Sequence, residues 1–475
     1  IPQHVIDGPQ PVLLRTIDVQ DHPQADREAV LDRVLRAESD RPFDLADDLM
    51  IRATLVSLAP DENVLLLVVH HVAIDGWSIP ILLHELSVAY EAALQETRPS
   101  LPDLPLQYAD YAVWQRNQLQ GDRLNPEVHY WRDQLADLSP VDLPTDHPRP
   151  TTQTFNADTH VFNLPSSVRP GVDALARNEK STRFMVLFAA LNAGLARYTG
   201  QTDIAIGSPI AGRPEEELAD VIGFFVNTLV LRTDTSGDPS FRTLLRRVRD
   251  TALDAYAHEA LPFDKLVEHL KPTREPGRTP FFQIMFALDR DDGRGLQLTG
   301  LNVESVKVKA SAAKFDLTVS IRESEDGLDG TLTYNTALFE ADTIDRMAGH
   351  FCTLLDAALA APDQALSTLP LLSETERQTL VNGWNDTTTD YPRTRSVPTI
   401  FEDQAELRPN LVALEHGDQI LTYRELNRRA NQLAHRLQEQ GVTSGAPVGL
   451  LTERSVEGTI CMLAILKAGG LYVPL

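Results

Sequence analysis

The sequence contains very little cysteine. Among its 475 residues only Cys352 and Cys461 carry thiols, and they lie far apart along the chain. This spacing fits neither a metal-binding cysteine cluster nor a redox pair, and two thiols cannot build a disulfide framework. We therefore expect no metal site, two partly buried free thiols and a reducing, cytoplasmic location.

Long apolar runs and an excess of positive charge are also missing. No segment reaches the roughly twenty consecutive apolar residues that a membrane-spanning helix needs. Lysine and arginine number 43 against 68 acidic residues, which gives a formal net charge of -25 at pH 7. Because this charge repels nucleic-acid phosphates and anionic lipid headgroups, we expect neither nucleic acid nor membrane as a partner.

Both ends of the chain lack the features of a natural terminus. The first residues, IPQHVIDG, include no initiator methionine and no signal sequence, and the last, LKAGGLYVPL, stop within a strand-like pattern. We expect the chain to be a fragment of a longer protein.

The length exceeds that of one ordinary hydrophobic core, and the pattern is that of an α/β protein. Strand-like patterns at residues 11–19 and 63–69 flank a helical pattern at 27–38. The proline-rich segment 139–153 cannot continue a helix or a central strand. We place a lobe boundary there, with a first lobe over residues 1–150 and a second over 151–372.

A polar segment separates these lobes from the end of the chain. Residues 373–395 are polar and rich in threonine, with Asp386, Asp390 and Pro392 among them, which is typical of a linker. Beyond it, residues 421–442 have an amphipathic helical pattern that ends at Gly441. We expect residues 396–475 to be the beginning of a third, incomplete unit.

The most informative passage is VLLLVVHHVAIDGWSIPILLHEL, residues 64–86. A buried strand runs into two histidines, a short polar turn and then a helix, with Ser78 as the expected helix cap and Pro80 in the first turn. The loop between the strand and the helix is therefore held at both ends by rigid elements, and its side chains are exposed at a strand end.

A histidine in this loop can act as a general base, because its pKa lies near neutrality, and an aspartate nearby can fix the loop or the ring tautomer. Gly76 permits a turn or a close approach of substrate that a side chain would block. The alternative is that the two histidines are structural groups with satisfied hydrogen bonds. The residues alone leave both interpretations open.

The spacing of His70, His71, Asp75 and Gly76 resembles the His-His-x-x-x-Asp-Gly motif of the condensation domains of non-ribosomal peptide synthetases. Their superfamily also includes chloramphenicol acetyltransferase-like enzymes. Four later segments resemble further core motifs of the family in the family's order: YADYAVW (108–114), IGFFVNTLVLR (222–232), HEALPFDKLVE (258–268) and REPGRTPFFQIMF (274–286, beginning at Arg274).

These later segments also have a structural interpretation. Tyr108, Tyr111 and Trp114 recur at the spacing of one packed helix face. Asn227 lies in an apolar run, where a polar side chain needs partners or a functional role. The resemblance implies that these motifs line or brace a tunnel and supply no acid or base.

By resemblance, His71 is the catalytic histidine and His70 supports the strand end. Asp75 is implied to be structural and held by an arginine, for which we predict Arg232. We predict the backbone N–H of Gly76 as a second donor to the oxyanion that forms in the reaction.

Trp77 and Ser78 also resemble the residues that follow the motif in condensation domains. Outside the motifs, Arg242, Arg246 and Arg249 share one face of a predicted helix. They suit either an acidic carrier helix or phosphate, or a solvated helix face.

The resemblance implies an α/β fold of two chloramphenicol acetyltransferase-like lobes that form a V-shaped pseudo-dimer with a central tunnel. The implied reaction joins a donor acyl thioester to the amine of an acceptor aminoacyl thioester. The implied partners are an upstream donor and a downstream acceptor carrier protein, each with a phosphopantetheine arm. No directly bound cofactor is implied. Two alternatives remain, an acyltransferase that uses a soluble acyl thioester and a non-catalytic scaffold that docks carrier proteins.

The tail resembles the start of an adenylation domain, with LTYREL at 421–426 and LKAGGLYVP at 466–474. ATP and Mg²⁺ are expected only for the complete domain, so this chain should adenylate nothing. Because the first condensation motifs are missing ahead of Ile1, we do not expect full activity from the chain by itself.

Overall fold

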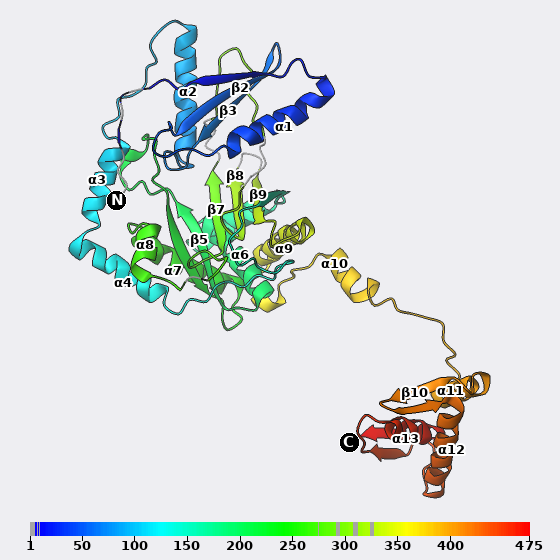
Figure 1. Ribbon diagram of the computed structural model, residues 1–475. Helices are drawn as coiled ribbons and strands as arrows, with labels where there is room; N and C mark the ends of the chain where they lie inside the picture. The colour runs from blue at the N-terminus through cyan, green and yellow to red at the C-terminus, as the bar shows by residue number, and fades with distance from the viewer. Residues whose placement is uncertain are drawn as a thin grey trace. The chain divides into compact units, whose positions relative to one another are not determined.

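A computed structural model describes residues 5–6, 8, 10–273, 275–290, 295–306, 312–323 and 327–475. Arg274, the first residue of one predicted motif, lies outside the described residues. The chain divides into two compact units, residues 1–379 and 380–475 (Figure 1). Within the described residues, no helix combines the length and the apolar character needed to cross a membrane.

The first unit contains a three-stranded sheet of β1 (Leu14–Asp18), β2 (Ile51–Ala59) and β3 (Glu62–Val69), in that order. Strands β2 and β3 form an antiparallel hairpin, whereas β1 runs parallel to β2 because α1 (Gln24–Asp40) connects them. Helix α2 (Ser78–Leu94) follows β3. The strands and the helix predicted in this region are therefore present.

A larger sheet has the order β4-β9-β8-β7-β5-β6. Its strands are β4 (Ala157–Asn163), β5 (Asp203–Ile210), β6 (Asn227–Asp234), β7 (Ile284–Arg290), β8 (Leu317–Glu323) and β9 (Leu328–Asn335). The β5–β7 and β7–β8 pairs are parallel and the other pairs are antiparallel. The sheet is mixed, and the predicted α/β class is confirmed.

The helices that pack around this sheet are α5 (Val168–Asn178), α6 (Arg183–Thr199), α7 (Phe241–Ala257), α8 (Phe263–Leu270) and α9 (Ala341–Ala360). Every residue of α6 from Met185 to Ala193 is buried. A helix that is buried on all sides lies within a core, and α6 contacts α5, α7 and α9 as well as β5.

Helices α3 (Tyr108–Gln118) and α4 (Leu124–Gln134) are joined by a short 3-10 turn, η1 (Gly121–Arg123). Trp131 of α4 is 1% exposed and belongs to the core of the larger sheet, and its ring N–H donates to the carbonyl of His258 at 3.0 Å. Val141 and Leu143 belong to the same core. Residues ahead of position 150 thus already pack with the larger sheet, and the lobe boundary at 150 stays a prediction.

The first unit ends with η3 (Leu366–Thr368) and α10 (Glu374–Gln378), and a π-helical turn, η4 (Thr379–Gly383), follows. The second unit contains α11 (Val397–Leu407), β10 (Val412–His416), β11 (Gln419–Thr422), α12 (Tyr423–Glu439), β12 (Pro447–Leu450), α13 (Val456–Lys467) and β13 (Leu471–Pro474). Helix α12 is the amphipathic helix predicted from the sequence, and Gly441 follows it with a φ of 94°.

Candidate active site

The candidate site is the loop 70–77 between β3 and α2. It is held by a crossover segment, residues 211–226, which connects β5 to β6 and includes a 3-10 turn, η2 (Glu216–Leu218). Sequence analysis predicted motifs in both segments, and hydrogen bonds join the two across more than a hundred positions.

His71 is exposed, and its ring is oriented by the loop itself. Nδ1 lies 2.7 Å from the backbone carbonyl oxygen of Ile74. Since a carbonyl oxygen only accepts hydrogen bonds, Nδ1 carries the proton and the neutral ring has its lone pair on Nε2. The ring of Phe224 from the crossover packs edge-to-face against His71, with 5.1 Å between centroids. The loop therefore holds one histidine tautomer, and no hydrogen-bond partner of Nε2 lies in the part of the chain that the structure describes.

His70 has a different environment. Its backbone N–H donates to the carbonyl of Met50 at 2.9 Å, which extends the β2–β3 pairing. Its Nδ1 accepts from the N–H of Val72 at 3.1 Å, and its ring packs edge-on against Phe43. These contacts are those of a residue that stabilises the strand end.

Asp75 is 2% exposed, and its carboxylate accepts hydrogen bonds from both segments. One oxygen, Oδ2, accepts from the backbone N–H groups of Phe225 at 2.8 Å and Val226 at 3.2 Å. The other, Oδ1, accepts from the backbone N–H of Ser78 at 2.9 Å and from Nη2 of Arg213 at 3.4 Å. These donors occupy both oxygens of the carboxylate, which is consistent with the structural role that the resemblance implies for Asp75.

The arginine beside Asp75 is Arg213, so the prediction of Arg232 is wrong. Burial lowers the pKa of the Arg213 guanidinium, and the charge of Asp75 opposes this effect. Arg213 also donates to backbone carbonyls of the crossover, to that of Val221 at 2.7 Å and to that of Leu218. Its guanidinium lies over the ring of Phe225.

Arg232 instead makes a bidentate pair with Asp203, at 2.8 Å and 2.7 Å, and donates to the carbonyls of Gln134 and Ala136. Its pKa is raised by the hydrogen bond and the charge of Asp203. The register pairs β5 and β6 so that Asp203 and Arg232 lie near each other at one end of both strands. Arg232 therefore joins two strands to the end of α4 and does not contact the histidine loop.

Ser78 is fully buried at the first position of α2, which makes the prediction of a Ser78 cap wrong. The side chain that accepts from the helix N-terminus is Asp75. The Ser78 hydroxyl lies 2.8 Å from Asp75 Oδ1 and accepts from the N–H of Gly223 at 3.1 Å. Ser78 thus contributes to the junction between loop and crossover.

Gly76 and Trp77 lie on the exposed side of the same loop. Gly76 does not have a positive φ, and no atom lies within 4 Å of the position that a Cβ would take. The turn therefore does not require glycine, and the space beside Gly76 is open. Trp77 is 51% exposed and donates from its ring N–H to the carbonyl of Ala219 at 3.0 Å.

Asn227 begins β6 and connects two predicted motifs. Its amide N–H₂ donates to the carbonyls of Glu259 and Leu261, each at 2.9 Å. Its oxygen accepts from the backbone N–H of Phe263 at 2.9 Å, at the start of α8. The polar side chain in the apolar run is thus satisfied by the turn 258–263, and it braces that turn.

The aromatic side chains of α3 pack against the crossover. Tyr108 donates to the carbonyl of Phe224 at 2.9 Å, and Tyr111 donates to that of Gly212 at 3.4 Å. Burial raises the pKa of Tyr111 to about 12. Both tyrosines contact the ring of Phe225, whereas Trp114 is 39% exposed. The interpretation of this motif as one packed face of a helix therefore holds for Tyr108 and Tyr111.

Residues 2–381 match the family model of the condensation domain. The chain belongs to the condensation-domain family. Residues 401–475 match the model of the AMP-binding enzymes, so the predicted order of the two domains is confirmed.

Condensation-domain relatives cover nearly all of the chain. A linear gramicidin synthase of Brevibacillus parabrevis is 46% identical over 468 residues, which is 97% of this chain and 9% of that protein. Malpibaldin synthetase of Mortierella alpina is 41% identical over 453 residues, 95% of this chain and 8% of that protein. The chain thus spans about a tenth of the length of these relatives.

Solved structures share the fold. The X-domain from teicoplanin biosynthesis is 27% identical with a TM-score of 0.71 and covers 78% of this chain and 83% of its own. A four-domain nonribosomal peptide synthetase bound to AMP and glycine has a TM-score of 0.79 at 24% identity, over 98% of this chain and 36% of its own. The second likeness shows the fold alone.

In this condensation domain, sequence reasoning missed Arg213 and the ring of Phe224. Arg213 follows the end of β5 by three positions, and no charge pattern distinguished it from the other arginines. The predicted arginine stripe of α7 also has structural partners: Arg242 and Arg246 pair with the buried Glu179, and Arg249 pairs with Asp250. In the described part of the chain, no cluster of three or more His, Cys, Asp or Glu residues is suited to a metal ion.

Proposed function

We propose that this condensation domain forms an amide bond between two carrier-bound substrates. A donor acyl or peptidyl thioester is attacked by the α-amine of an acceptor aminoacyl thioester, and each thioester is carried on the phosphopantetheine arm of a carrier protein. The observation that carries the proposal is the orientation of His71, whose Nδ1–H donates to the carbonyl of Ile74 and whose Nε2 has no hydrogen-bond partner among the described residues.

The chemistry needs one proton acceptor. As the amine nitrogen bonds to the thioester carbonyl carbon, nitrogen loses a proton and the carbonyl oxygen gains negative charge. Nε2 of His71 can accept that proton or orient the amine by a hydrogen bond. The C–S bond then breaks, and the departing thiolate takes up the proton. Neither thiol of the chain is suited to an acyl-enzyme, because burial raises the pKa of Cys352 to about 11 and also raises that of Cys461.

The remaining site residues are proposed to position His71. Asp75, Ser78 and Arg213 fix the loop against the crossover, and His70 fixes its beginning. The N–H of Gly76 is proposed as a donor to the oxyanion, because the open space beside this residue lets a substrate approach the backbone. Asn227 and Arg232 brace elements farther from the loop.

The setting of the reaction is part of the proposal. We assign residues 1–150 and 151–372 to the two lobes around a substrate tunnel, 373–395 to a linker and 396–475 to the start of an adenylation domain. The upstream and downstream carrier proteins are the proposed partners, together with the adenylation domain in the same chain. ATP and Mg²⁺ would serve only the complete adenylation domain. The proposed location is the cytoplasm.

The test is a reaction between two separately prepared carrier proteins that bear different acyl groups, followed by intact-mass measurement. The protein used is the whole chain in its full-length form, and the same protein with His71→Ala is the comparison. Dipeptidyl product on the downstream carrier, lost in H71A, supports condensation. Transfer to a free amine from a soluble thioester would favour the acyltransferase instead. Binding of carriers without any transfer would leave only the docking scaffold.

A further inference from the structure

An exposed phenylalanine lies beside the histidine of the candidate site. The ring of Phe224 packs against the ring of His71, with 5.1 Å between the centroids and 88° between the ring planes. Phe224 is 37% exposed, although both of its neighbours in the chain, Gly223 and Phe225, are buried. A large apolar side chain that stays accessible next to a reactive group is a candidate contact surface for a substrate.

The backbone that carries this ring is fixed on both sides. The N–H of Gly223 donates to the Ser78 hydroxyl at 3.1 Å, and the N–H that follows Phe224 donates to Asp75 at 2.8 Å. The carbonyl of Phe224 accepts from the Tyr108 hydroxyl at 2.9 Å. A Cβ at Gly223 would lie 2.4 Å from the ring of Tyr108, so the chain approaches α3 too closely for a side chain there. The position of the Phe224 ring is therefore preorganised, which favours substrate binding.

The geometry of the proposed reaction brings one substrate side chain close to this ring. A hydrogen bond from the acceptor amine to Nε2 of His71 spans about 2.9 Å, which puts the amine nitrogen roughly 4 Å from the centre of the His71 ring. The centre of the Phe224 ring lies 5.1 Å from the same point. The acceptor side chain begins at the α-carbon, which is bonded directly to the amine nitrogen. The donor side chain begins beyond the carbonyl carbon that the amine attacks, so the acceptor side chain is the nearer of the two.

The exposed side chains around His71 are mainly apolar. Val72 and Trp77 of the loop are each 51% exposed, and Ile79 in the first turn of α2 is 48% exposed. The one carboxylate of this loop, Asp75, is 2% exposed. A polar substituent placed against such a surface loses water and gains no hydrogen bond in return, whereas an apolar substituent gains from the contact.

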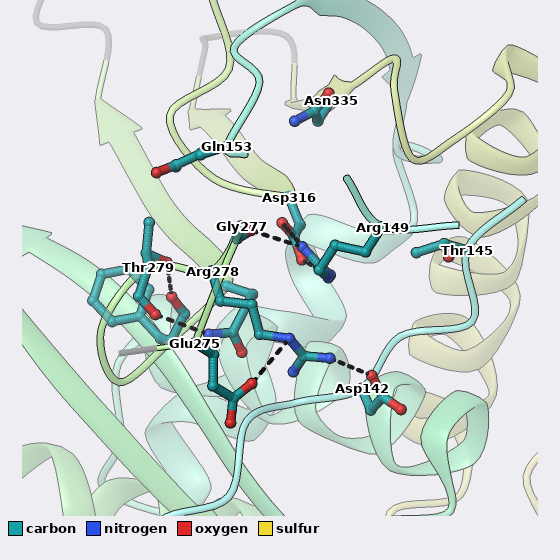
Figure 2. Close-up of polar contacts among 12 residues, drawn as sticks. Asp142, Thr145, Arg149, Gln153, Glu275, Gly277, Arg278, Thr279, Asp316 and Asn335 are labelled. Carbon is teal, nitrogen blue, oxygen red and sulfur yellow. Dashed lines mark hydrogen bonds and ion pairs between the residues drawn. The ribbon is translucent and has the colours of Figure 1, made fainter. Parts of the chain in front are cut away.

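Two cavities of the first unit lie away from His71. One is lined by the end of α4, the end of α8 and the loop before β7, and there Arg278 is already paired with Asp142 at 2.6 Å and with Glu275 at 3.4 Å (Figure 2). The other lies at the start of α6. The described residues that line these two cavities all lie outside the histidine loop and the crossover. Recognition of a side chain beside His71 therefore depends on the exposed residues of the loop and the crossover themselves.

We propose that Phe224 is a specificity-determining residue for the acceptor. Its exposed ring contacts the side chain of the acceptor aminoacyl group and favours an apolar side chain over a polar one of the same size. This inference rests on the proposed condensation reaction and adds the class of its acceptor, an α-amino acid with an apolar side chain.

The test compares two acceptors of nearly equal shape. Leucyl and asparaginyl groups have side chains of similar size, but only the leucyl side chain is apolar. The full-length protein reacts with one loaded donor carrier and with either acceptor carrier, and intact mass measured over time gives kcat/KM for each acceptor. Because both reactions use His71 and the same donor, an effect of a substitution on the histidine cancels in the ratio. The leucyl acceptor should be preferred, and Phe224→Ala should lower this preference by roughly fivefold to tenfold.

Three further variants assign the effect to the ring. Phe224→Leu keeps an apolar side chain and should retain most of the preference, whereas Phe224→Gln should lower it at least as far as Phe224→Ala. Phe155→Ala is the matched control, because Phe155 is 52% exposed and precedes β4, at the opposite edge of the larger sheet from β6. It should leave the preference unchanged.

The outcomes separate this inference from the reaction on which it rests. Equal kcat/KM for the two acceptors in the unsubstituted protein would overturn the role of Phe224 and leave the condensation reaction intact. A preference that both Phe224→Ala and Phe224→Gln leave unchanged would do the same. Absence of amide product with either acceptor in the unsubstituted protein would overturn the proposed condensation itself.

Discussion

Nη2 of Arg213 lies 3.4 Å from Oδ1 of Asp75, and the two side chains are 4% and 2% exposed. They come from separate segments of the chain, and each is also hydrogen-bonded to Ser78. A buried ion pair of this kind is costly to break, because the remaining charge loses its partner without regaining water.

Asp75→Asn and Arg213→Gln should therefore each lower the free energy of unfolding by about 3–5 kcal/mol. The double variant should lose less than the sum, with a coupling of roughly 0.5–3 kcal/mol. Urea unfolding followed by circular dichroism gives the free energy of unfolding of the unsubstituted chain, the two single variants and the double variant. Arg232→Gln combined with Asp75→Asn is the control, and its effects should add within about 0.5 kcal/mol. If the effects of Asp75→Asn and Arg213→Gln on the free energy of unfolding were additive, the ion pair between Asp75 and Arg213 would be contradicted.

His71→Ala should lower the rate of amide formation by ~10²–10⁴-fold if Nε2 accepts the proton. The melting temperature should change little, because the ring is exposed. The comparison is His129→Ala on α4, whose side chain is 73% exposed and lies outside the loop. Equal rates in the two variants would remove His71 from the mechanism.

Tyr108→Phe removes the hydroxyl that donates to the carbonyl of Phe224, the residue whose ring packs against His71. The loss should reduce kcat by at most about fivefold, the factor that corresponds to the whole ~1 kcal/mol that one such hydrogen bond contributes. Tyr111→Phe is the matched control, since its hydroxyl donates to Gly212 instead. A fall in kcat that is the same for both variants would argue against a specific effect through Phe224.

Labelling of Cys352 should be slow at pH 8 and accelerate steeply at high pH. Burial raises the pKa of this thiol from 9.0 to about 11, so the reactive thiolate is scarce below that value. Between pH 8 and pH 10 the iodoacetamide labelling rate should rise by about tenfold per pH unit. Site-resolved mass spectrometry separates Cys352 from Cys461, and the denatured chain serves as the reference. Labelling of folded and denatured chain at one rate would mean that the thiol is not protected.

Local patterns predicted much of the fold. The buried strand before His70, the helix after Ser78 and the amphipathic helix near the C-terminus follow from hydrophobic periodicity and turn residues, which act over short distances. The ordered motifs also identified the family. They could not identify the partner of Asp75, because an ion pair between distant segments depends on how the chain returns to the loop.

Arg232 illustrates this limit. Its place in a predicted motif made it a reasonable partner for Asp75, yet β-sheet register puts it beside Asp203. Gln283 illustrates another limit, since nothing in the sequence shows that this side chain is 2% exposed and that its Oε1 has no hydrogen-bond partner among the described residues. Both facts depend on tertiary contacts.

The bonds from Phe225 and Val226 to Asp75 have a consequence for building chimeric synthetases. A recombination junction between residues 79 and 210 would take the histidine loop from one parent and its supporting backbone from another. The amide groups themselves would survive such an exchange, but the contacts of Arg213 with Asp75 and Ser78 would then join side chains from two parents. Hybrids that inherit residues 70–226 from a single parent should therefore retain activity more often than hybrids joined within that span.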